Sequence, residues 1–172
     1  MPERTIRYLG DPVLKTPAAA VTRFGKSLEA LITDLMDTVA LPGRAGLAAP
    51  QIGVGLRAFS YNVGEQRGYV INPELVEVSE EKQDGEEGCL SVPGLYFPTL
   101  RGMRAVVRGV DLRNEPVVVS GEAEMARCLQ HEVDHLDGIL YLDRLDSQTR
   151  RQAMREVRSS GWFMRSGNRA AR

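Results

Sequence analysis

The amino-acid sequence predicts an α+β fold, in which antiparallel or mixed sheets pack around a central helix and a further helix lies near the C-terminus. Two observations lead to this class. Apolar residues recur with the helical period near the start, in the second half and near the end of the chain, and short extended segments lie between these stretches. Helices and strands do not alternate one by one, which argues against a parallel sheet built from βαβ units.

The first predicted helix covers about residues 28–39. The intervals between its apolar residues alternate between three positions and one position. This spacing places them on one face of an amphipathic helix. Ser27 is the expected N-cap of this helix, and Pro42 with Gly43 is expected to end it.

Extended segments follow the first helix. Residues 56–61, 68–73 and 75–78 are short runs with polar or glycine-containing connections, which is typical of strands. Two runs rich in β-branched side chains, 103–112 and 117–119, flank the turn-forming residues Asn114 and Pro116. We therefore predict an antiparallel hairpin there.

The central helix is predicted over about residues 122–136, with Gly121 before it and Gly138 just after its C-cap. One face is an apolar stripe of four residues: Met125, Leu129, Val133 and Leu136. A neighbouring face has four polar residues: Cys128, His131, Glu132 and His135. Because the stripe puts this helix in the core, its polar face must contact groups that satisfy it. A third helix is predicted over about residues 147–158.

The composition fits one globular domain over residues 1–172, with a basic, flexible tail from about residue 159. The 22 Lys and Arg residues nearly balance the 23 Asp and Glu residues, so no excess of positive charge indicates DNA as a partner. No run approaches the roughly 20 apolar residues that cross a bilayer, and the charged N-terminus lacks the apolar part of a secretory signal. We therefore expect a cytoplasmic protein with no membrane partner.

The strongest chemical signal is the run from His131 to His135, which reads His-Glu-Val-Asp-His. Residues four apart lie one above the other on a helix, so both imidazoles can bind a single metal ion. Glu132 stands about 100° round the helix axis, where it can act as a base on a water molecule beside that ion. The alternative is a solvated helix face that contains two histidines by chance. The concentration of both histidines of the chain here favours the metal site.

Two histidines leave a catalytic Zn²⁺ or Fe²⁺ ion short of a third protein ligand. Cys89, Cys128 and a carboxylate are the alternatives. Three ligands on one stiff helix from Cys128 to His135 would span about 10 Å, too far for bonds of about 2.0–2.3 Å. Cys89 follows an extended stretch that can approach the helix, although a buried structural cysteine is common. Spacing thus favours Cys89 and leaves Cys128 open.

A third unusual stretch, residues 43–53, is rich in Gly and Ala and contains Gln51. Small residues let a ligand backbone approach closely, and an amide N–H of Gln51 could stabilise a developing oxyanion. Taken alone, a tight packing turn is the better interpretation of this stretch.

Together, three segments resemble the peptide deformylase family: Gly46-Leu47-Ala48-Ala49-Pro50-Gln51, Glu87-Gly88-Cys89-Leu90-Ser91 and Gln130-His131-Glu132-Val133-Asp134-His135. They occur in the family's order and spacing within residues 4–145. The resemblance implies an α+β fold whose central helix is the metal-binding one. It also implies an enzyme that removes the formyl group from the N-formylmethionine of nascent peptides. One divalent metal ion is implied as cofactor, Fe²⁺ in the cell, with Zn²⁺, Ni²⁺ or Co²⁺ able to replace it.

Carried over position by position, the resemblance implies a role for each motif residue. The implied metal ligands are Cys89, His131 and His135, and the implied acid/base is Glu132. Gln51 and the backbone N–H of Leu90 would bind the formyl oxygen, and the backbone of Gly46 would hold the peptide in an extended pose. A pocket for the methionine side chain is expected from apolar and neighbouring residues: Ile52, Cys128, Leu129 and His131.

One position departs from the family pattern. Arg44 stands two residues before Gly46, where the family has glycine. We expect Arg44 at the rim of the site, in contact with the peptide.

Glu87 and Arg101 are expected either to pair and brace the cysteine strand or to be solvated separately.

The C-terminal segment from Gln148 contains seven arginines and one glutamate, a local charge of +6. A solvated, frayed tail is slightly favoured, and contact with ribosomal RNA near the nascent chain is the alternative.

Two other functions compete with deformylation. A zinc protease would use the same helix motif, and a metal-stabilised binding module would catalyse no reaction.

Overall fold

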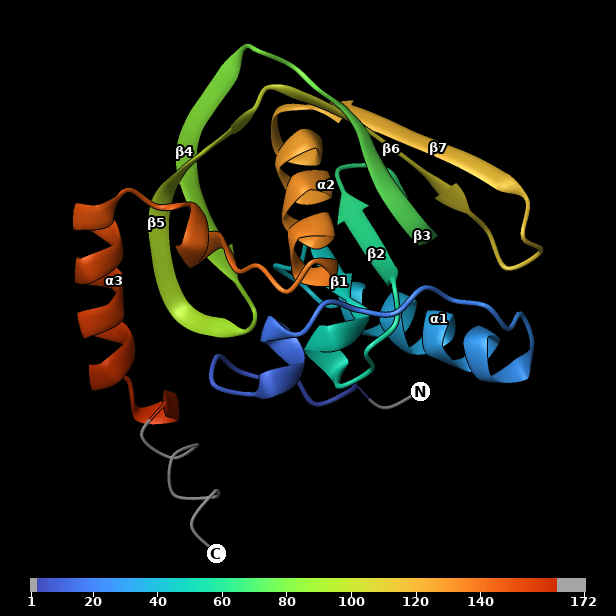
Figure 1. Cartoon of the computed structure of the whole chain (residues 1–172), viewed down its shortest axis with the longest axis horizontal. Helices are drawn as coiled ribbons and strands as arrows, with labels where there is room; N and C mark the ends of the chain where they lie inside the picture. The colour runs from blue at the N-terminus through green and yellow to red at the C-terminus, as the bar shows by residue number, and fades with distance from the viewer. Residues whose placement is uncertain (1–2, 164–172) are drawn as a thin grey trace, which may run out of the picture.

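The computed structural model describes residues 3–163. Its main sheet has five strands in the order β1-β2-β3-β6-β7, and neighbouring strands are antiparallel. These strands are β1 (Gly46–Ala48), β2 (Ala58–Val63), β3 (Gln66–Val78), β6 (Arg104–Val110) and β7 (Pro116–Glu122). A separate antiparallel pair consists of β4 (Lys82–Cys89) and β5 (Val92–Gly102). Figure 1 shows the helix α2 (Ala123–Leu136) at the centre, between these two sheets. The predicted α+β class is confirmed.

Alternation along the strands gives the main sheet two apolar faces. Phe59 and Val70 pack with the stripe of α2, whereas their neighbours Ala58 and Ile71 pack with α1 (Lys26–Val39). Successive strand residues point to opposite faces, so the sheet lies between the two helices. All four predicted stripe residues of α2 are buried in the first of these clusters: Met125, Leu129, Val133 and Leu136. The apolar packing holds α2 in place and turns its polar face toward β4.

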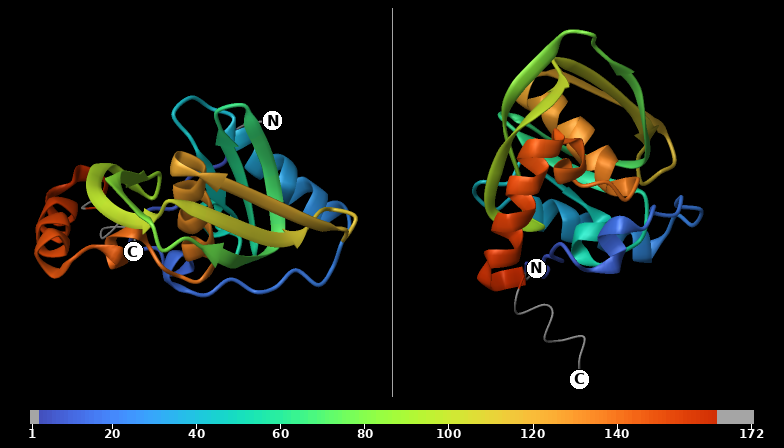
Figure 2. Two further views of the ribbon diagram at one scale, coloured as in Figure 1. Left: turned by 90° about the horizontal axis from the view of Figure 1, so that it is seen from above. Right: turned by 60° about the vertical axis from the view of Figure 1, so that its left-hand side comes forward.

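The third helix, α3 (Ser147–Ser159), packs against the β4–β5 pair, away from the five-stranded sheet (Figure 2). Asp146 caps it by accepting hydrogen bonds from the backbone N–H groups of Gln148 and Thr149. Short 3-10 helices complete the fold: η1 (Pro12–Lys15), η2 (Ala49–Ile52) and η3 (Tyr141–Arg144). The predicted basic tail from residue 159 falls mostly outside the described residues. No helix in the described part of the chain has the length and apolar character needed to span a membrane.

Local predictions differ from the structure at several places. Helix α1 begins at Lys26 with Gly25 as N-cap, so the expected cap Ser27 lies within the first turn. Two predicted strands merge into β3, which has an irregularity between Ile71 and Glu74 where Asn72 adopts a φ of 49° and its side chain bonds both backbone groups of Val21. The β4–β5 pair was predicted only in part, since glycines, prolines and charged residues hide the alternating pattern of its strands.

Gly138 ends α2 at the predicted position. Its φ is +73°, and a Cβ there would lie 2.9 Å from the backbone carbon and oxygen of Lys15. We expect Gly138→Ala to lower the free energy of unfolding by about 2 kcal/mol. Alanine is strained in the left-handed backbone conformation, and the backbone of Lys15 has to move to make room for its Cβ. Urea denaturation measures the change. Gly55→Ala is the control, since a Cβ at Gly55 meets no atom within 4 Å and its φ is outside the left-handed region. Equal losses in the two variants would contradict this explanation.

Candidate active site

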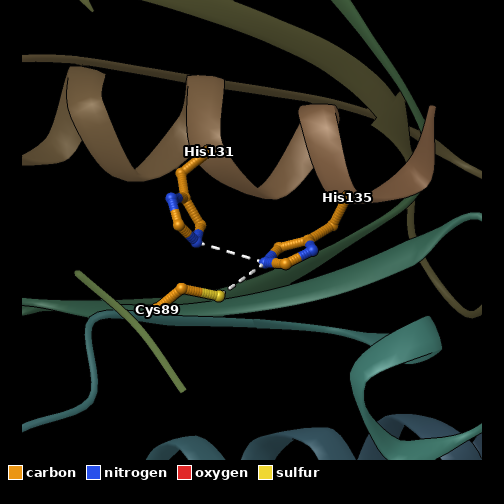
Figure 3. A group of neighbouring side chains, drawn as sticks. All are labelled: Cys89, His131 and His135. Carbon is orange, nitrogen blue, oxygen red and sulfur yellow. Dashed lines mark hydrogen bonds between the residues drawn. The ribbon is translucent and has the colours of Figure 1, made fainter. Parts of the chain in front are cut away.

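The centre of the site is formed by α2 and the end of β4. His131 and His135 point from α2 toward Cys89 on the strand (Figure 3). His131 Nε2 lies 3.1 Å from His135 Nε2, and His135 Nε2 lies 3.3 Å from the Cys89 Sγ. One ligand atom from each of the three residues lies within 4.8 Å of the other two. A bulge between Gly88 and Cys89 in the β4–β5 pairing lies beside this group.

The donor set fits one divalent metal ion. In a tetrahedral site with bonds of about 2.0–2.3 Å, neighbouring ligand atoms lie about 3.3–3.6 Å apart. The measured separations of 3.1 Å and 3.3 Å are close to this spacing. One thiol and two imidazoles also match the ligand preferences of Zn²⁺ and Fe²⁺. Cys89, His131 and His135 therefore form a group that can hold such an ion.

Glu87 orients one of the two histidines. Its Oε1 lies 2.6 Å from His131 Nδ1, and its carboxylate also accepts hydrogen bonds from Arg101 and Arg127. Burial alone would raise the pKa of Glu87, but the hydrogen bonds and positive charges of His131 and Arg101 lower it well below its usual value. A carboxylate on the far ring nitrogen fixes the orientation of a metal-binding histidine. The predicted pair of Glu87 and Arg101 is confirmed, with a distance of 2.6 Å.

A second buried carboxylate continues this network. Asp134 accepts hydrogen bonds from Arg101 at 2.7 Å and from Arg144 at 2.6 Å. The network ties α2 to β5 and to η3. Sequence reasoning missed Arg127, Asp134 and Arg144. A signal was available for two of them, because Arg127 lies four residues before His131 and Asp134 directly before His135, on a helix predicted to be buried.

Glu132 lies beside the ligand group and is 2% exposed. Its Oε2 atom is buried without a hydrogen-bond partner among the described residues. Burial is the main reason that the pKa of Glu132 rises to about 7. A Cβ on Gly46 would overlap the Glu132 carboxylate, so only glycine leaves room for this side chain. The arrangement places a proton-accepting group next to the metal ligands.

Gln51 is held so that its amide nitrogen faces Cys89. Its Oε1 accepts a hydrogen bond from the backbone N–H of Ala48 at 2.9 Å. Its Nε2 donates to Ser91 Oγ at 3.2 Å and lies 3.6 Å from Cys89 Sγ. Leu90 follows Cys89 directly and lines the same cleft. The Gln51 amide thus places a hydrogen-bond donor beside Cys89.

These residues line a cleft of ≈ 950 Å³. Most of the residues predicted for the site lie on its walls: Arg44, Gly46, Gln51, Cys89, Leu90, Cys128, His131 and Glu132. Two predicted pocket residues lie elsewhere. Leu129 is fully buried between α2 and the five-stranded sheet, and Ile52 packs against the cluster around α1. Leu129 follows Cys128 by about 100° of helix rotation, which turns it from the cleft to the sheet.

Cys128 is placed differently from Cys89. Its thiol donates a hydrogen bond to the carbonyl of Ala45 at 3.3 Å. Burial raises the pKa of this thiol well above its usual value, and the carboxylates of Glu132 and Glu124 raise it further. A metal ligand is a thiolate, which these surroundings disfavour. Of the two cysteines, Cys89 is the one grouped with the histidines.

Arg44 lines the cleft, as expected, but its guanidinium is already bound within the protein. It donates a hydrogen bond to the carbonyl of Thr38 at 3.0 Å and pairs with Glu3. Thr38 lies in the last turn of α1, where carbonyl groups lack helical partners. The expected contact of Arg44 with a peptide has to compete with these two interactions.

Comparisons with known proteins agree with this geometry. The model of the Polypeptide deformylase family matches residues 3–151. The chain is 53% identical to a peptide deformylase of Acidothermus cellulolyticus over 162 residues, which cover 94% of this chain and 89% of the relative. It is 44% identical to peptide deformylase 1 of Corynebacterium glutamicum, with 95% and 99% covered.

Solved structures agree with the sequence comparisons. A peptide deformylase from Legionella pneumophila superposes with a TM-score of 0.85 at 38% identity, covering 98% of this chain and 99% of that one. A peptide deformylase from Ehrlichia chaffeensis in complex with actinonin superposes with a TM-score of 0.84 at 34% identity, covering 91% and 96%. The chain therefore belongs to the polypeptide deformylase family, metal-dependent hydrolases that remove the formyl group from the N-terminus of nascent polypeptides.

Proposed function

We propose that this chain hydrolyses the formamide bond of N-formylmethionyl peptides with Glu132 as general base and then general acid. The observation that supports this role most directly is the buried Glu132 carboxylate, which lies beside Cys89, His131 and His135 and keeps one oxygen without a partner among the described residues. A raised pKa of about 7 suits a group that must accept and return a proton near neutral pH.

We propose Cys89, His131 and His135 as the ligands of one divalent ion, which is Fe²⁺ in the cell, with Zn²⁺, Ni²⁺ or Co²⁺ able to replace it. When bound, such an ion acts as a Lewis acid that lowers the pKa of water from 15.7 toward about 7 and polarises a carbonyl oxygen. Glu87 supports this assignment, because its contact with His131 Nδ1 leaves His131 Nε2 directed at the other two ligands.

Gln51 and Leu90 are proposed to stabilise the negative charge that develops on the formyl oxygen. Gln51 supports this role because its Oε1 is tied to Ala48 N, which leaves its amide N–H groups directed toward Cys89 and Ser91. The backbone N–H of Leu90 is the second donor. Removing one such donor typically lowers the rate by about 10²- to 10³-fold.

The peptide is proposed to bind along the free edge of β1. This strand is the last one in its sheet, and its pairing with β2 uses only one edge. Gly46 at the start of β1 lines the cleft next to Glu132. An added strand is held by backbone hydrogen bonds, which tolerate many side chains beyond the first. The methionine side chain is proposed to lie against Cys128, with Leu129 and Ile52 outside the pocket wall.

Proton transfer completes the proposed cycle. Glu132 takes a proton from the attacking water, and the same carboxyl group gives a proton to the leaving amine as the bond between the formyl carbon and nitrogen breaks. The products are formate and a peptide with a free N-terminus. Because the Glu132 carboxyl group packs directly against Gly46, the proton stays close to the reacting atoms.

Formate release from a formyl-Met peptide, after anaerobic loading with Fe²⁺, tests the proposed function. The expected result is turnover of the formylated peptide and no cleavage of an internal bond. Internal cleavage without a preference for formylated substrates would favour a zinc protease instead.

We infer the cytoplasm as the site of action, because formylated nascent chains are made there. Ribosome contact through the arginines of α3 stays a prediction. Arg151, Arg155 and Arg158 are exposed on this helix, whereas Arg150 pairs with Asp143 at 3.0 Å. A solvated helix face is the alternative.

A further inference from the structure

One part of the cleft extends from the ligand group along α2, past Cys128 and Arg127 to Glu124. Gly46 contacts Glu132, and the preceding residue, Ala45, accepts a hydrogen bond from Cys128, one turn earlier on the helix. The chain from Gly46 back to Ala45 therefore runs toward the first turn of α2. Ala45 lines the cleft, whereas Leu47 on the other side of Gly46 is fully buried. A peptide that pairs with the free edge of β1, with its formyl group beside Glu132, would extend toward the first turn of α2.

Glu124 stands at this exit. It lies eight residues before Glu132 on the same face of α2, because residues 124, 128 and 132 are spaced by four. Its side chain is exposed and lines the cleft. Gln83 on β4 donates a hydrogen bond to the carbonyl of Ala123 at 2.8 Å, which fixes the first turn of α2 against the opposite wall. The backbone that carries Glu124 is therefore held by two ordered elements.

The charges around the exit leave Glu124 unneutralised. Each cleft-lining arginine pairs with a carboxylate: Arg127 with Glu87, Arg44 with Glu3 and Arg4 with Asp34. Within residues 3–163, Glu124 has no ion-pair partner. Two other acids of the lining have no ion pair among the described residues. Glu132 is the buried carboxylate beside the ligand group. Glu86 neighbours the inward-facing Glu87 on β4, so its side chain turns to the opposite face of the strand. The exit has a negative charge and no free positive charge among the described lining residues.

We propose that Glu124 is a specificity-determining residue that pairs with a Lys or Arg side chain among the first three residues after formylmethionine. The proposal rests on the deformylase function proposed for this cleft. A rise of about 1.5 Å per residue puts Glu124 about 12 Å from Glu132 along α2. An extended peptide advances about 3.3 Å per residue, so its second to fourth residues pass within reach of a long basic side chain. Chains with basic residues there are deformylated faster than chains with acidic residues.

The test uses the metal-loaded enzyme and amidated formyl-Met-Ala-Ala-Ala peptides in which one alanine is replaced by Lys or by Glu. For wild type, we expect kcat/KM to favour the Lys peptide over the Glu peptide by about threefold to tenfold in at least one position, the size of effect typical of partly exposed charge pairs. Higher salt should reduce the ratio, because mobile ions screen a solvent-exposed charge pair. Glu124→Gln should bring the ratio close to one, and Glu124→Lys should reverse it.

Glu122→Gln is the matched control. Glu122 is the N-cap residue of α2 and does not line the cleft, so this variant changes the same charge near the same helix end and should keep the wild-type ratio. A ratio near one in wild type, or an unchanged ratio in Glu124→Gln, would overturn the proposal. A lower melting temperature of Glu124→Gln with an unchanged ratio would assign Glu124 to helix stability alone. Failure of wild type to release formate from the all-alanine peptide would instead contradict the proposed function.

Discussion

Glu132→Gln is expected to lower kcat for formyl-peptide hydrolysis by about 10²- to 10⁴-fold, the usual contribution of a general acid/base. Glutamine has nearly the same shape, so it fits beside Gly46, but it cannot accept and return a proton. No other carboxylate can take over, because Glu87 is bound by His131 and two arginines. The three proposed metal ligands stay in place, so the variant should keep about the wild-type metal content. Steady-state kinetics and elemental analysis of the same preparation measure both quantities.

The control for this variant is Glu156→Gln. Glu156 lies on α3, outside the cleft, and its replacement removes the same charge without touching the site. It should keep wild-type kcat. Near-normal turnover of Glu132→Gln would show that another group transfers the proton. Loss of metal together with activity would show instead that Glu132 maintains the ligand group.

The elements best predicted from the sequence are those in which one face is buried. The apolar stripe of α2 is such a case, since Met125 and Leu129 pack against the sheet where their spacing placed them. The β6–β7 hairpin also follows its prediction, with Asn114 at a φ of 60° in the turn. Strand β1 was missed, because three residues are too few to show a period and its pairing with β2 is a long-range contact.

The part of the site that could be predicted from the sequence is the group of residues on α2. The spacing of His131 and His135 indicates a shared ion, whereas the choice between Cys89 and Cys128 depends on how β4 approaches α2. The ion pairs of Asp134 with Arg101 and Arg144 join segments far apart in the sequence, so no local pattern reveals them. Arg44 shows the same limit, because its partners Thr38 and Glu3 lie on other segments.

Cys89→Ser is expected to weaken metal binding by at least about 100-fold. Substitutions of residues that only hydrogen-bond to metal ligands already lower metal affinity by about 10- to 100-fold. The variant replaces a soft thiolate, which donates strongly to Fe²⁺ or Zn²⁺, with a hydroxyl group that stays protonated. Activity should fall with the metal content. Competition with a chelator of known affinity measures the change directly. The helical circular dichroism signal should persist, because α2 is held by apolar packing on its other face.

Cys128→Ser is the matched control, because it makes the same substitution on the other cysteine. A serine hydroxyl can donate to the carbonyl of Ala45 as the thiol does, and the thiol of Cys128 is not grouped with the histidines. This variant should therefore keep its metal and most of its activity. If Cys128→Ser lost the metal while Cys89→Ser kept it, the ligand assignment would be reversed. If Cys89→Ser unfolded together with metal loss, the ion would be needed for folding, as expected for a metal-stabilised binding module rather than a catalytic site on a preformed fold.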